Sequence, residues 1–121
     1  MKKILIVDNQ KEVRELVEII LRSGDYKILQ AKNAKEAIET VEAEKPDLVI
    51  MDIMMPGEMD GIEATRFLKE NSQTKNSKII ILTVKGQTTD LDEGIRAGAD
   101  GYFIKPFSPI DLIRKVEEII G

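Results

Sequence analysis

The sequence predicts an α/β fold in which five parallel strands and five helices alternate along the chain and form a doubly wound sheet. Three observations support this fold class. Three apolar runs are short and continuous, which is typical of parallel strands buried on both faces. Amphipathic segments of helical length separate these runs. The length of 121 residues indicates a single domain over residues 1–121, with no effector domain after it.

The strands are predicted from runs of mainly β-branched apolar residues, which are enriched in strands. Continuous runs give the first, third and fourth strands, and weaker patterns give the second and the fifth. In chain order the expected strands are Ile4 to Val7, Tyr26 to Ala31, Leu48 to Met51, Ile79 to Leu82, and Gly101 to Ile104. Right-handed crossovers would place the intervening helices on both faces of the sheet.

The helices are predicted from apolar residues at helical spacing. In chain order the stripes are Val13, Leu16, Val17 and Ile20; Ala34, Ala37, Ile38 and Val41; Ile62, Phe67 and Leu68; Leu91 and Ile95; and Ile110, Ile113, Val116 and Ile120. Gly94 interrupts the fourth stripe and weakens it. Ser108 is a candidate N-cap of the last helix, with Pro109 at its first position.

Composition excludes several kinds of chemistry. The chain has no cysteine and no histidine, which excludes disulfides, the usual zinc sites and catalysis that depends on histidine. The net charge is −4 and no cluster of lysine or arginine stands out, so direct nucleic-acid binding is not expected. No apolar run approaches the roughly 20 residues that span a bilayer, so membrane insertion is not expected. The first residues do not form a signal peptide, and a cytoplasmic location is therefore expected.

The winding of the sheet predicts where a ligand would bind. A doubly wound sheet of five parallel strands commonly has the order 2-1-3-4-5, and its ligands bind beyond the carboxyl ends of strands 1 and 3. Asp8 lies at the end of the first predicted strand and Asp52 at the end of the third. The sequence therefore predicts two carboxylates in one crevice, where each raises the pKa of the other. Such strain is typical of functional sites.

Asp52 has the chemistry of a phosphoryl acceptor. A carboxylate oxygen can attack phosphorus and form an acyl phosphate. The repulsion between this carboxylate and an anionic donor must be offset, and magnesium is the natural ion for that purpose. The alternative is that Asp52 merely caps a loop at a strand end, as an isolated aspartate often does. Its pairing with Asp8 favours the first interpretation.

The other polar residues at the strand ends each have two interpretations. Asp8 and Asn9 could hold a metal, or could start a turn and cap the following helix, and both can be true together. Thr83 could donate its hydroxyl to a phosphoryl oxygen, although threonine is common in strands. Lys105 could present a positive charge, and Pro106 permits a cis peptide that would fix the direction of the lysine. The ordered set of Asp, Asp, Thr and Lys at four strand ends favours the functional interpretations.

Beyond these strand ends, the sequence resembles the receiver domain of bacterial two-component response regulators over nearly its whole length. The matching segments are Ile4 to Asp8, Pro46 to Pro56, Met59 to Gly61, Ile81 to Thr83, Gly98 to Tyr102, and Lys105 to Phe107. The resemblance implies a flavodoxin-like three-layer sandwich that works as a stand-alone signalling switch. It would not be an enzyme beyond taking part in its own magnesium-dependent phosphorylation and dephosphorylation.

The resemblance also implies a donor and a set of metal ligands. Asp52 would accept the phosphoryl group from a histidine kinase or a phosphotransfer protein, as in a phosphorelay. Asp8, Asn9 and Asp52 would hold magnesium together with the backbone carbonyl of Met54.

By the same resemblance, two residues would contact the phosphoryl oxygens, namely Thr83 and Lys105. Tyr102 would be the switch aromatic, which rotates inward when Thr83 moves toward the phosphoryl group. Period-two alternation places Tyr102 on the strand face opposite Phe103. The output would be a changed surface around the fourth helix, fifth strand and fifth helix. A downstream target protein or a second copy, in a phosphorylation-dependent homodimer, would bind this surface.

Three features depart from the family pattern. Asn9 stands where a second acidic residue is usual, so weaker magnesium affinity and slower phosphorylation are expected. Val84 stands where a small residue is usual and could crowd access to the phosphoryl group. The loop from Pro56 to Gly61 is one residue longer than the commonest form.

Two other functions remain open on the sequence. A degenerate receiver would act as a constitutive protein-docking module, with Asn9 marking decay of the metal site. Retention of Asp52, Thr83 and Lys105 argues against this. An aspartyl-phosphate phosphatase of the haloacid-dehalogenase type would carry Asp-x-Asp after its first strand, which this chain lacks.

Overall fold

The computed structural model describes residues 1–84 and 88–121, and the side chains of residues 1–83 and 92–121. In these residues the strands are β1 Lys2–Val7, β2 Tyr26–Ala31, β3 Leu48–Asp52, β4 Lys78–Val84 and β5 Gly101–Lys105. The helices are α1 Lys11–Leu21, α2 Ala34–Glu44, α3 Gly61–Glu70, α4 Thr88–Arg96 and α5 Pro109–Ile120. Within the described part of the chain, no helix has both the length and the apolar character needed to cross a bilayer.

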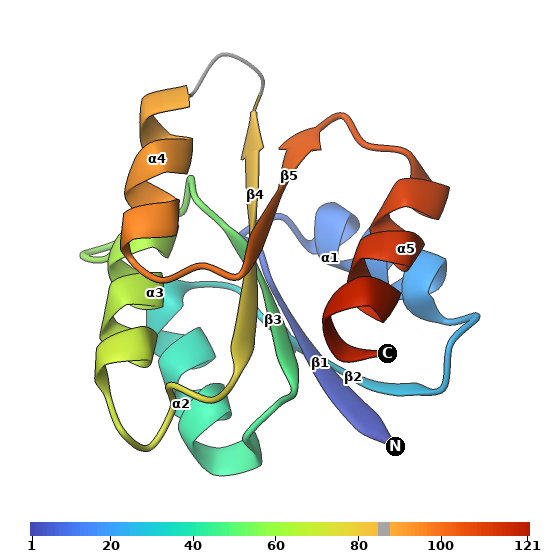
Figure 1. Ribbon diagram of the computed structural model, residues 1–121, viewed down its shortest axis with the longest axis horizontal. Coiled ribbons are helices and arrows are strands. Elements are labelled where there is room, and N and C mark those ends of the chain that lie inside the picture. The colour runs from blue at the N-terminus through green and yellow to red at the C-terminus, as the bar shows by residue number, and fades with distance from the viewer. Residues whose placement is uncertain (85–87) are drawn as a thin grey trace.

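The five strands form one parallel sheet in the predicted order β2-β1-β3-β4-β5. Figure 1 shows the outer layers: α1 and α5 cover one face of the sheet, and α2, α3 and α4 cover the other. The predicted three-layer sandwich is thus confirmed. In the centre of the sheet β1 and β3 are neighbours, with Val7 opposite Met51. Asp8 follows Val7 and Asp52 follows Met51, so the two aspartates lie side by side at the carboxyl edge of the sheet.

The core explains why the apolar runs are continuous. Ile4, Leu5, Ile6 and Val7 are all 0% exposed. Leu5 and Val7 pack with the buried side chains of α2 and α3, whereas Ile4 and Ile6 pack with those of α1 and α5. Since successive side chains of a strand point to opposite faces, a central strand covered on both faces is apolar at every position.

All five predicted strands are present, and four of them extend beyond the apolar runs. The ladder of β4 continues past the apolar run to Val84, which pairs with Lys105. Thr83 therefore lies inside β4 rather than at its end, which corrects the predicted boundary. Backbone hydrogen bonding sets the end of a strand, and it does not require apolar side chains.

The stripe predicted for the first helix is partly wrong. Val17 is fully buried as expected, but the side chain of Leu16 is 55% exposed. Leu21, which the stripe omitted, is buried instead. Residues four apart lie on the same side of a helix, so Leu21 shares the face of Val17 whereas Leu16 lies beside that face.

The stripes predicted for the last three helices are also partly wrong, since Phe67, Ile95 and Ile110 are 41%, 51% and 59% exposed. In α5, Leu112, which the stripe omitted, is buried instead. Ser108 is the N-cap residue of α5 and Pro109 is at its first position, although the Ser108 hydroxyl makes no capping hydrogen bond. Gly94 is buried in α4, where a Cβ atom would collide with the Cδ1 atom of Ile81. The glycine that interrupts the fourth stripe thus permits a close approach of α4 to β4. The side chain of Leu91 lies outside the described residues.

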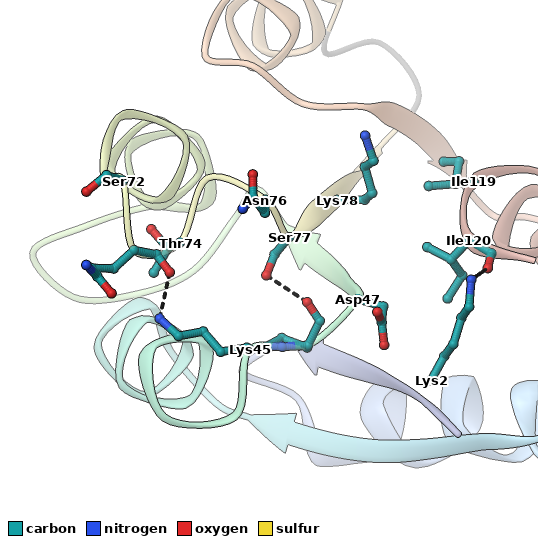
Figure 2. A pocket seen from close by; sticks show the side chains of 12 residues that line it. Lys2, Lys45, Asp47, Ser72, Thr74, Asn76, Ser77, Lys78, Ile119 and Ile120 are labelled. Atoms are coloured by element: carbon teal, nitrogen blue, oxygen red, sulfur yellow. Dashed lines mark hydrogen bonds between the residues drawn. The ribbon is translucent and has the colours of Figure 1, made fainter.

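The amino edge of the sheet carries a polar hollow of about 610 Å³, shown in Figure 2. The ammonium groups of Lys2 and Lys45 line it, and each donates to a main-chain carbonyl, that of Ile120 and that of Gln73 respectively. Carbonyls at a helix C-terminus have no partner within the helix, and lysine is a common donor to them. The lysines of this hollow therefore tie together chain segments at the edge opposite Asp52.

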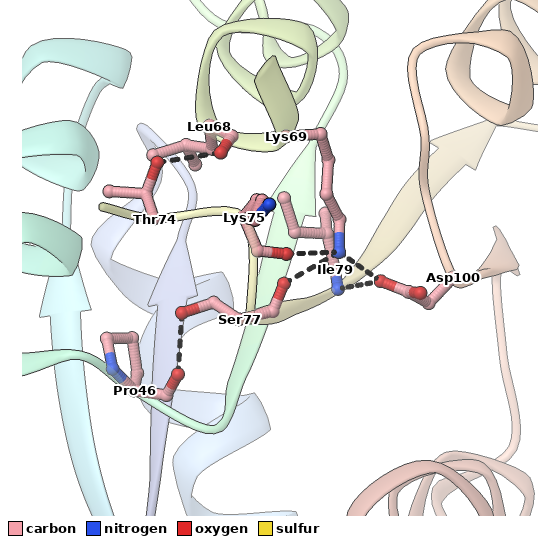
Figure 3. A network of polar contacts seen from close by, with 8 residues as sticks. All are labelled: Pro46, Leu68, Lys69, Thr74, Lys75, Ser77, Ile79 and Asp100. Atoms are coloured by element: carbon pink, nitrogen blue, oxygen red, sulfur yellow. Dashed lines mark hydrogen bonds and ion pairs between the residues drawn. The ribbon is translucent and has the colours of Figure 1, made fainter. Parts of the chain in front are cut away.

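A polar network beside this hollow fixes the start of β4 (Figure 3). The Lys69 ammonium donates to the Ser77 carbonyl at 2.8 Å and lies 2.8 Å from a carboxylate oxygen of Asp100. The same Asp100 oxygen accepts from the Ile79 amide at 2.9 Å. One lysine and one aspartate thus join α3, β4 and the segment between α4 and β5.

Candidate functional site

Three of the predicted residues meet at the carboxyl edge of the sheet. Asp52 is the last residue of β3, Asp8 directly follows β1, and Lys105 is the last residue of β5. The Lys105 ammonium lies 3.4 Å from Oδ2 of Asp8 and 3.6 Å from Oδ1 of Asp52. Asp8 and Asp52 are only 1% and 6% exposed, so both carboxylates are largely shielded from water, and Lys105 lies within 4 Å of each.

Burial and charge change the acidity of Asp52. Its pKa is raised from an ordinary 3.8 to about 6, mainly by burial and next by the negative charge of Asp8. A hydrogen bond with the Asp8 side chain raises the pKa further, because it favours the protonated form. Lys105 and the Met54 amide, which donates to Asp52 Oδ1 at 3.4 Å, oppose these effects. The carboxylate of Asp52 is therefore mostly ionised at neutral pH.

Asp8 is held by its main chain as well as by its side chain. Its amide donates to the Ala31 carbonyl at 3.2 Å, and its Oδ1 atom accepts from the Gln10 amide at 2.9 Å. The second bond is an Asx turn, so the predicted turn is confirmed. The predicted cap is wrong, because Gln10 is the N-cap residue of α1 and its side chain makes no capping bond.

Thr83 is buried beside the other residues of the site. Its side chain is 3% exposed. It lies on β4 one position beyond Leu82, which pairs with Asp52, and it pairs with Ile104, the residue before Lys105. Thr83 therefore lies on the strand between those of Asp52 and Lys105, near the carboxyl edge of the sheet where all three strands end. The side chain of Val84 lies outside the described residues.

The last strand has the predicted alternation. Tyr102 and Ile104 are 44% and 43% exposed. Phe103 faces the other side, where it packs against the core between the sheet and α1 and α5. The peptide bond between Lys105 and Pro106 is cis. Tyr102 thus has an outward orientation on the surface formed with α4.

The start of α3 supports Asp52, and the sequence analysis did not identify this contact. The Gly61 amide donates to the Ile53 carbonyl at 3.0 Å. A Cβ atom at Gly61 would collide with the carbonyl oxygen of Asp52, so only glycine fits here. Asp60 and Glu63 form a capping box that fixes this end of α3. The Asp60-x-x-Glu63 spacing was a signal for that box, whereas the close contact follows only from packing.

The loop before α3 contains a glycine with positive φ. Gly57 has φ +110°, a conformation that favours glycine. Two residues later Met59 packs against the core on the α2 and α3 side of the sheet. Met59 directly precedes Asp60, the N-cap residue of α3, so this packing holds the chain where the helix begins.

The donor atoms of the site suit magnesium. Two buried carboxylates are supplied by Asp8 and Asp52, and the nearby residues Asn9 and Met54 carry a neutral amide and a neutral carbonyl oxygen. These are all hard oxygen donors, which magnesium prefers, usually with one or two carboxylates and several waters. Among the side chains of residues 1–83 and 92–121, no three His, Cys, Asp or Glu gather closely enough to hold a metal by themselves. Asn9, the residue after Asp8, is an amide rather than a third carboxylate.

Known proteins resemble this chain in both sequence and fold. The family model of the response regulator receiver domain matches residues 4–117. The phosphate regulon transcriptional regulatory protein PhoB of Pseudomonas aeruginosa is 39% identical over 98% of this chain and 52% of that protein. The transcriptional regulatory protein SrrA of Staphylococcus aureus is 38% identical over 98% of this chain and 47% of that protein. The chain thus spans about half the length of these curated relatives. Among solved structures, the Vibrio cholerae chemotaxis protein CheY4 superposes with a TM-score of 0.90, at 30% identity over 99% of each chain.

Proposed function

Because this chain belongs to the response regulator receiver domain family of two-component systems, we propose that it is a switch whose phosphoryl acceptor is Asp52. One observation carries the assignment to this residue. Asp52 ends a central strand with the Asp8 carboxylate beside it and the Lys105 ammonium 3.6 Å from its oxygen. A nucleophilic carboxylate with an adjacent acid and a cation is the set of groups that phosphoryl transfer to aspartate requires.

The proposed donor is the phosphohistidine of a histidine kinase or a phosphotransfer protein. An ionised oxygen of Asp52 forms a bond to phosphorus while the bond from phosphorus to the histidine nitrogen breaks, and its electron pair returns to the imidazole. The raised pKa of Asp52 makes its oxygen a stronger nucleophile toward phosphorus, while the carboxylate stays mostly ionised at neutral pH. Asp8, Asp52, Asn9 and the Met54 carbonyl would hold magnesium, which supplies positive charge that offsets the repulsion between acceptor and phosphoryl group.

The switch follows from the added charge. A phosphoryl group brings about −1.5 to −2 charge and three strong acceptor oxygens to Asp52. The Lys105 ammonium, 3.6 Å from Asp52, and the hydroxyl of Thr83 on the neighbouring strand β4 would donate to these oxygens. Movement of Thr83 toward the phosphoryl group would let Tyr102, now outward, turn inward. This biases an equilibrium between two forms of the surface made by α4, β5 and α5, which a target protein or a second copy binds.

The test is phosphorylation by a small donor. The protein is incubated with acetyl phosphate and magnesium and its intact mass is measured beside that of Asp52→Asn. We expect a gain of one phosphoryl group in the starting protein and none in the variant. Labelling that persists in Asp52→Asn would identify another acceptor. No labelling of the starting protein, together with no spectral response to beryllium fluoride, would instead support the docking module.

A further inference from the structure

An arginine on α1 holds the main chain of the β1–α1 turn. The Nη1 atom of Arg14 donates to the carbonyl oxygen of Asp8 at 2.6 Å, and its Nε atom donates to Oε1 of Gln30 at 3.0 Å. The Gln30 amide nitrogen in turn donates to Oε1 of Glu18 at 2.7 Å. The guanidinium is thus fixed between the turn that carries Asp8 and the outer strand β2.

We propose that Arg14 is a positioning residue that sets the magnesium affinity of the site through the main chain of Asp8 and Asn9. The inference rests on the proposed function, because it concerns the metal ligands of that function. The carbonyl that Arg14 binds belongs to the peptide bond between Asp8 and Asn9, so the bond orients both residues. Asn9 is exposed and carries no charge to attract a metal, so its contribution depends on where the turn holds its amide.

The geometry suits arginine in particular. A guanidinium is planar and its donors are separated, so it can serve the Asp8 carbonyl and the Gln30 side chain at once. The single ammonium of a lysine, on a flexible stem, cannot hold both acceptors in the same way. Residues that orient metal ligands from outside typically change metal affinity about 10- to 100-fold when they are removed.

The charge of Arg14 and its positioning of the turn have opposite expected effects on magnesium affinity. A positive charge near the carboxylates opposes magnesium, so electrostatics alone would strengthen magnesium binding when Arg14 becomes neutral. If Arg14 positions the turn, the same substitution weakens binding. The sign of the change therefore separates the two effects.

The experiment measures magnesium binding by isothermal titration calorimetry and by the amide NMR shifts of Asp8 and Asn9. The sequence has no tryptophan, so its fluorescence cannot serve as the reporter. We expect Arg14→Met to weaken magnesium binding about 10-fold and Arg14→Lys to weaken it less. Arg66→Met is the matched control. Arg66 is exposed on α3, and its substitution likewise replaces one arginine by methionine and removes one positive charge. It should leave the affinity unchanged.

A second variant covers the case in which Arg14→Met does not fold. Gln30→Leu removes the acceptor of the Arg14 Nε atom on the edge strand β2 and changes no residue of the site. We expect it to weaken magnesium binding less than Arg14→Met does. Phosphorylation by acetyl phosphate gives an independent measurement. In Arg14→Met the magnesium concentration for half-maximal rate should rise, while the rate at saturating magnesium should stay that of the starting protein.

The outcomes also separate this inference from the proposed function. If the starting protein binds magnesium and is phosphorylated but Arg14→Met and Gln30→Leu bind magnesium equally or more tightly, the role of Arg14 is wrong and the function stands. If saturating magnesium does not restore the rate of Arg14→Met, Arg14 acts on something other than the metal ligands. If the starting protein neither binds magnesium nor gains a phosphoryl group, both proposals are wrong.

Discussion

At the scale of residues, the site depends on like charges held together out of water. Asp8 and Asp52 are both nearly buried, and Lys105 is the cation within 4 Å that the described residues give them. Burial and mutual repulsion both favour the protonated form of one carboxylate, and the lysine offsets only part of this cost. The pKa of Asp52, raised to about 6, reflects the balance of these effects.

The raised pKa of Asp52 predicts how stability depends on pH in the metal-free protein. Between 3.8 and about 6 the folded state binds more protons than the unfolded chain, so the free energy of unfolding falls as pH rises through this window. Above it, ionised Asp52 destabilises the fold. We expect Asp52→Asn to raise the free energy of unfolding by about 1–3 kcal/mol near pH 7, and by much less near pH 4.

Urea unfolding followed by circular dichroism, with a chelator present, checks this expectation. Asp25→Asn serves as the control, since Asp25 is exposed between α1 and β2 and its substitution should have little effect at any pH. A stabilisation by Asp52→Asn that grows on acidification would contradict the sign derived above.

Single residues also mark the limit of what the sequence predicted. Asp8, Asp52 and Lys105 could be assigned to one site because the carboxyl ends of parallel strands share an edge. The bond from Arg14 to the Asp8 carbonyl could not, because it depends on the rotamer of a long side chain against a main-chain atom. The exposure of Leu16 was missed for a related reason. The orientation of α1 on the sheet decides which of its apolar side chains are buried, and the sequence does not contain that orientation.

At the scale of elements, α3 determines where Asp52 stands. Its first residue, Gly61, packs directly on the backbone of Asp52, and the capping box of Asp60 and Glu63 fixes the start of the helix. The continuous apolar run was enough to predict β3. The contact with α3 could not be predicted from it, because two main chains approach closely only where packing demands it.

Substitution of Gly61 tests this contact. On helix propensity alone Gly61→Ala would stabilise α3 by up to about 1 kcal/mol. The collision of the new Cβ atom with the Asp52 carbonyl oxygen and the Ile53 Cα atom reverses this sign. We expect a loss of about 1–3 kcal/mol in the free energy of unfolding, with slower phosphorylation because the end of β3 must shift.

Gly94→Ala provides a matched comparison. The new Cβ atom there would meet only the end of the Ile81 side chain, which can change rotamer. Gly94→Ala should therefore cost less stability than Gly61→Ala, and equal costs would show that the main-chain contact at Gly61 is not special.

At the scale of the whole molecule, the candidate site and the polar network of Lys69 and Asp100 lie at opposite edges of the sheet. The carboxyl edge holds the acidic site, and the amino edge is tied together by lysines and by the network of Lys69 and Asp100 (Figure 3). The sequence predicted the strand order, and so the place of the site. It did not predict the amino-edge network, whose members come from α3, the start of β4 and the segment between α4 and β5.

The separation of the edges gives a further prediction. Asp100→Ala leaves the Ile79 amide without this acceptor and removes the ion pair of Lys69, so we expect a loss of about 1–3 kcal/mol in the free energy of unfolding. Asp100→Asn retains an acceptor oxygen and should lose less. Magnesium affinity, measured by calorimetry, should be unchanged in both variants. A weaker affinity would show that the edges are coupled.

The site has one more consequence, which concerns synthesis of the chain. Asp8 and Lys105, which meet at 3.4 Å, are 97 positions apart in the sequence. A nascent chain therefore carries Asp52 well before it carries Lys105, and it completes the site only when β5 joins the sheet. If Asp52 is the phosphoryl acceptor, as proposed, and needs Lys105 for that reaction, only chains that have finished folding would be phosphorylated.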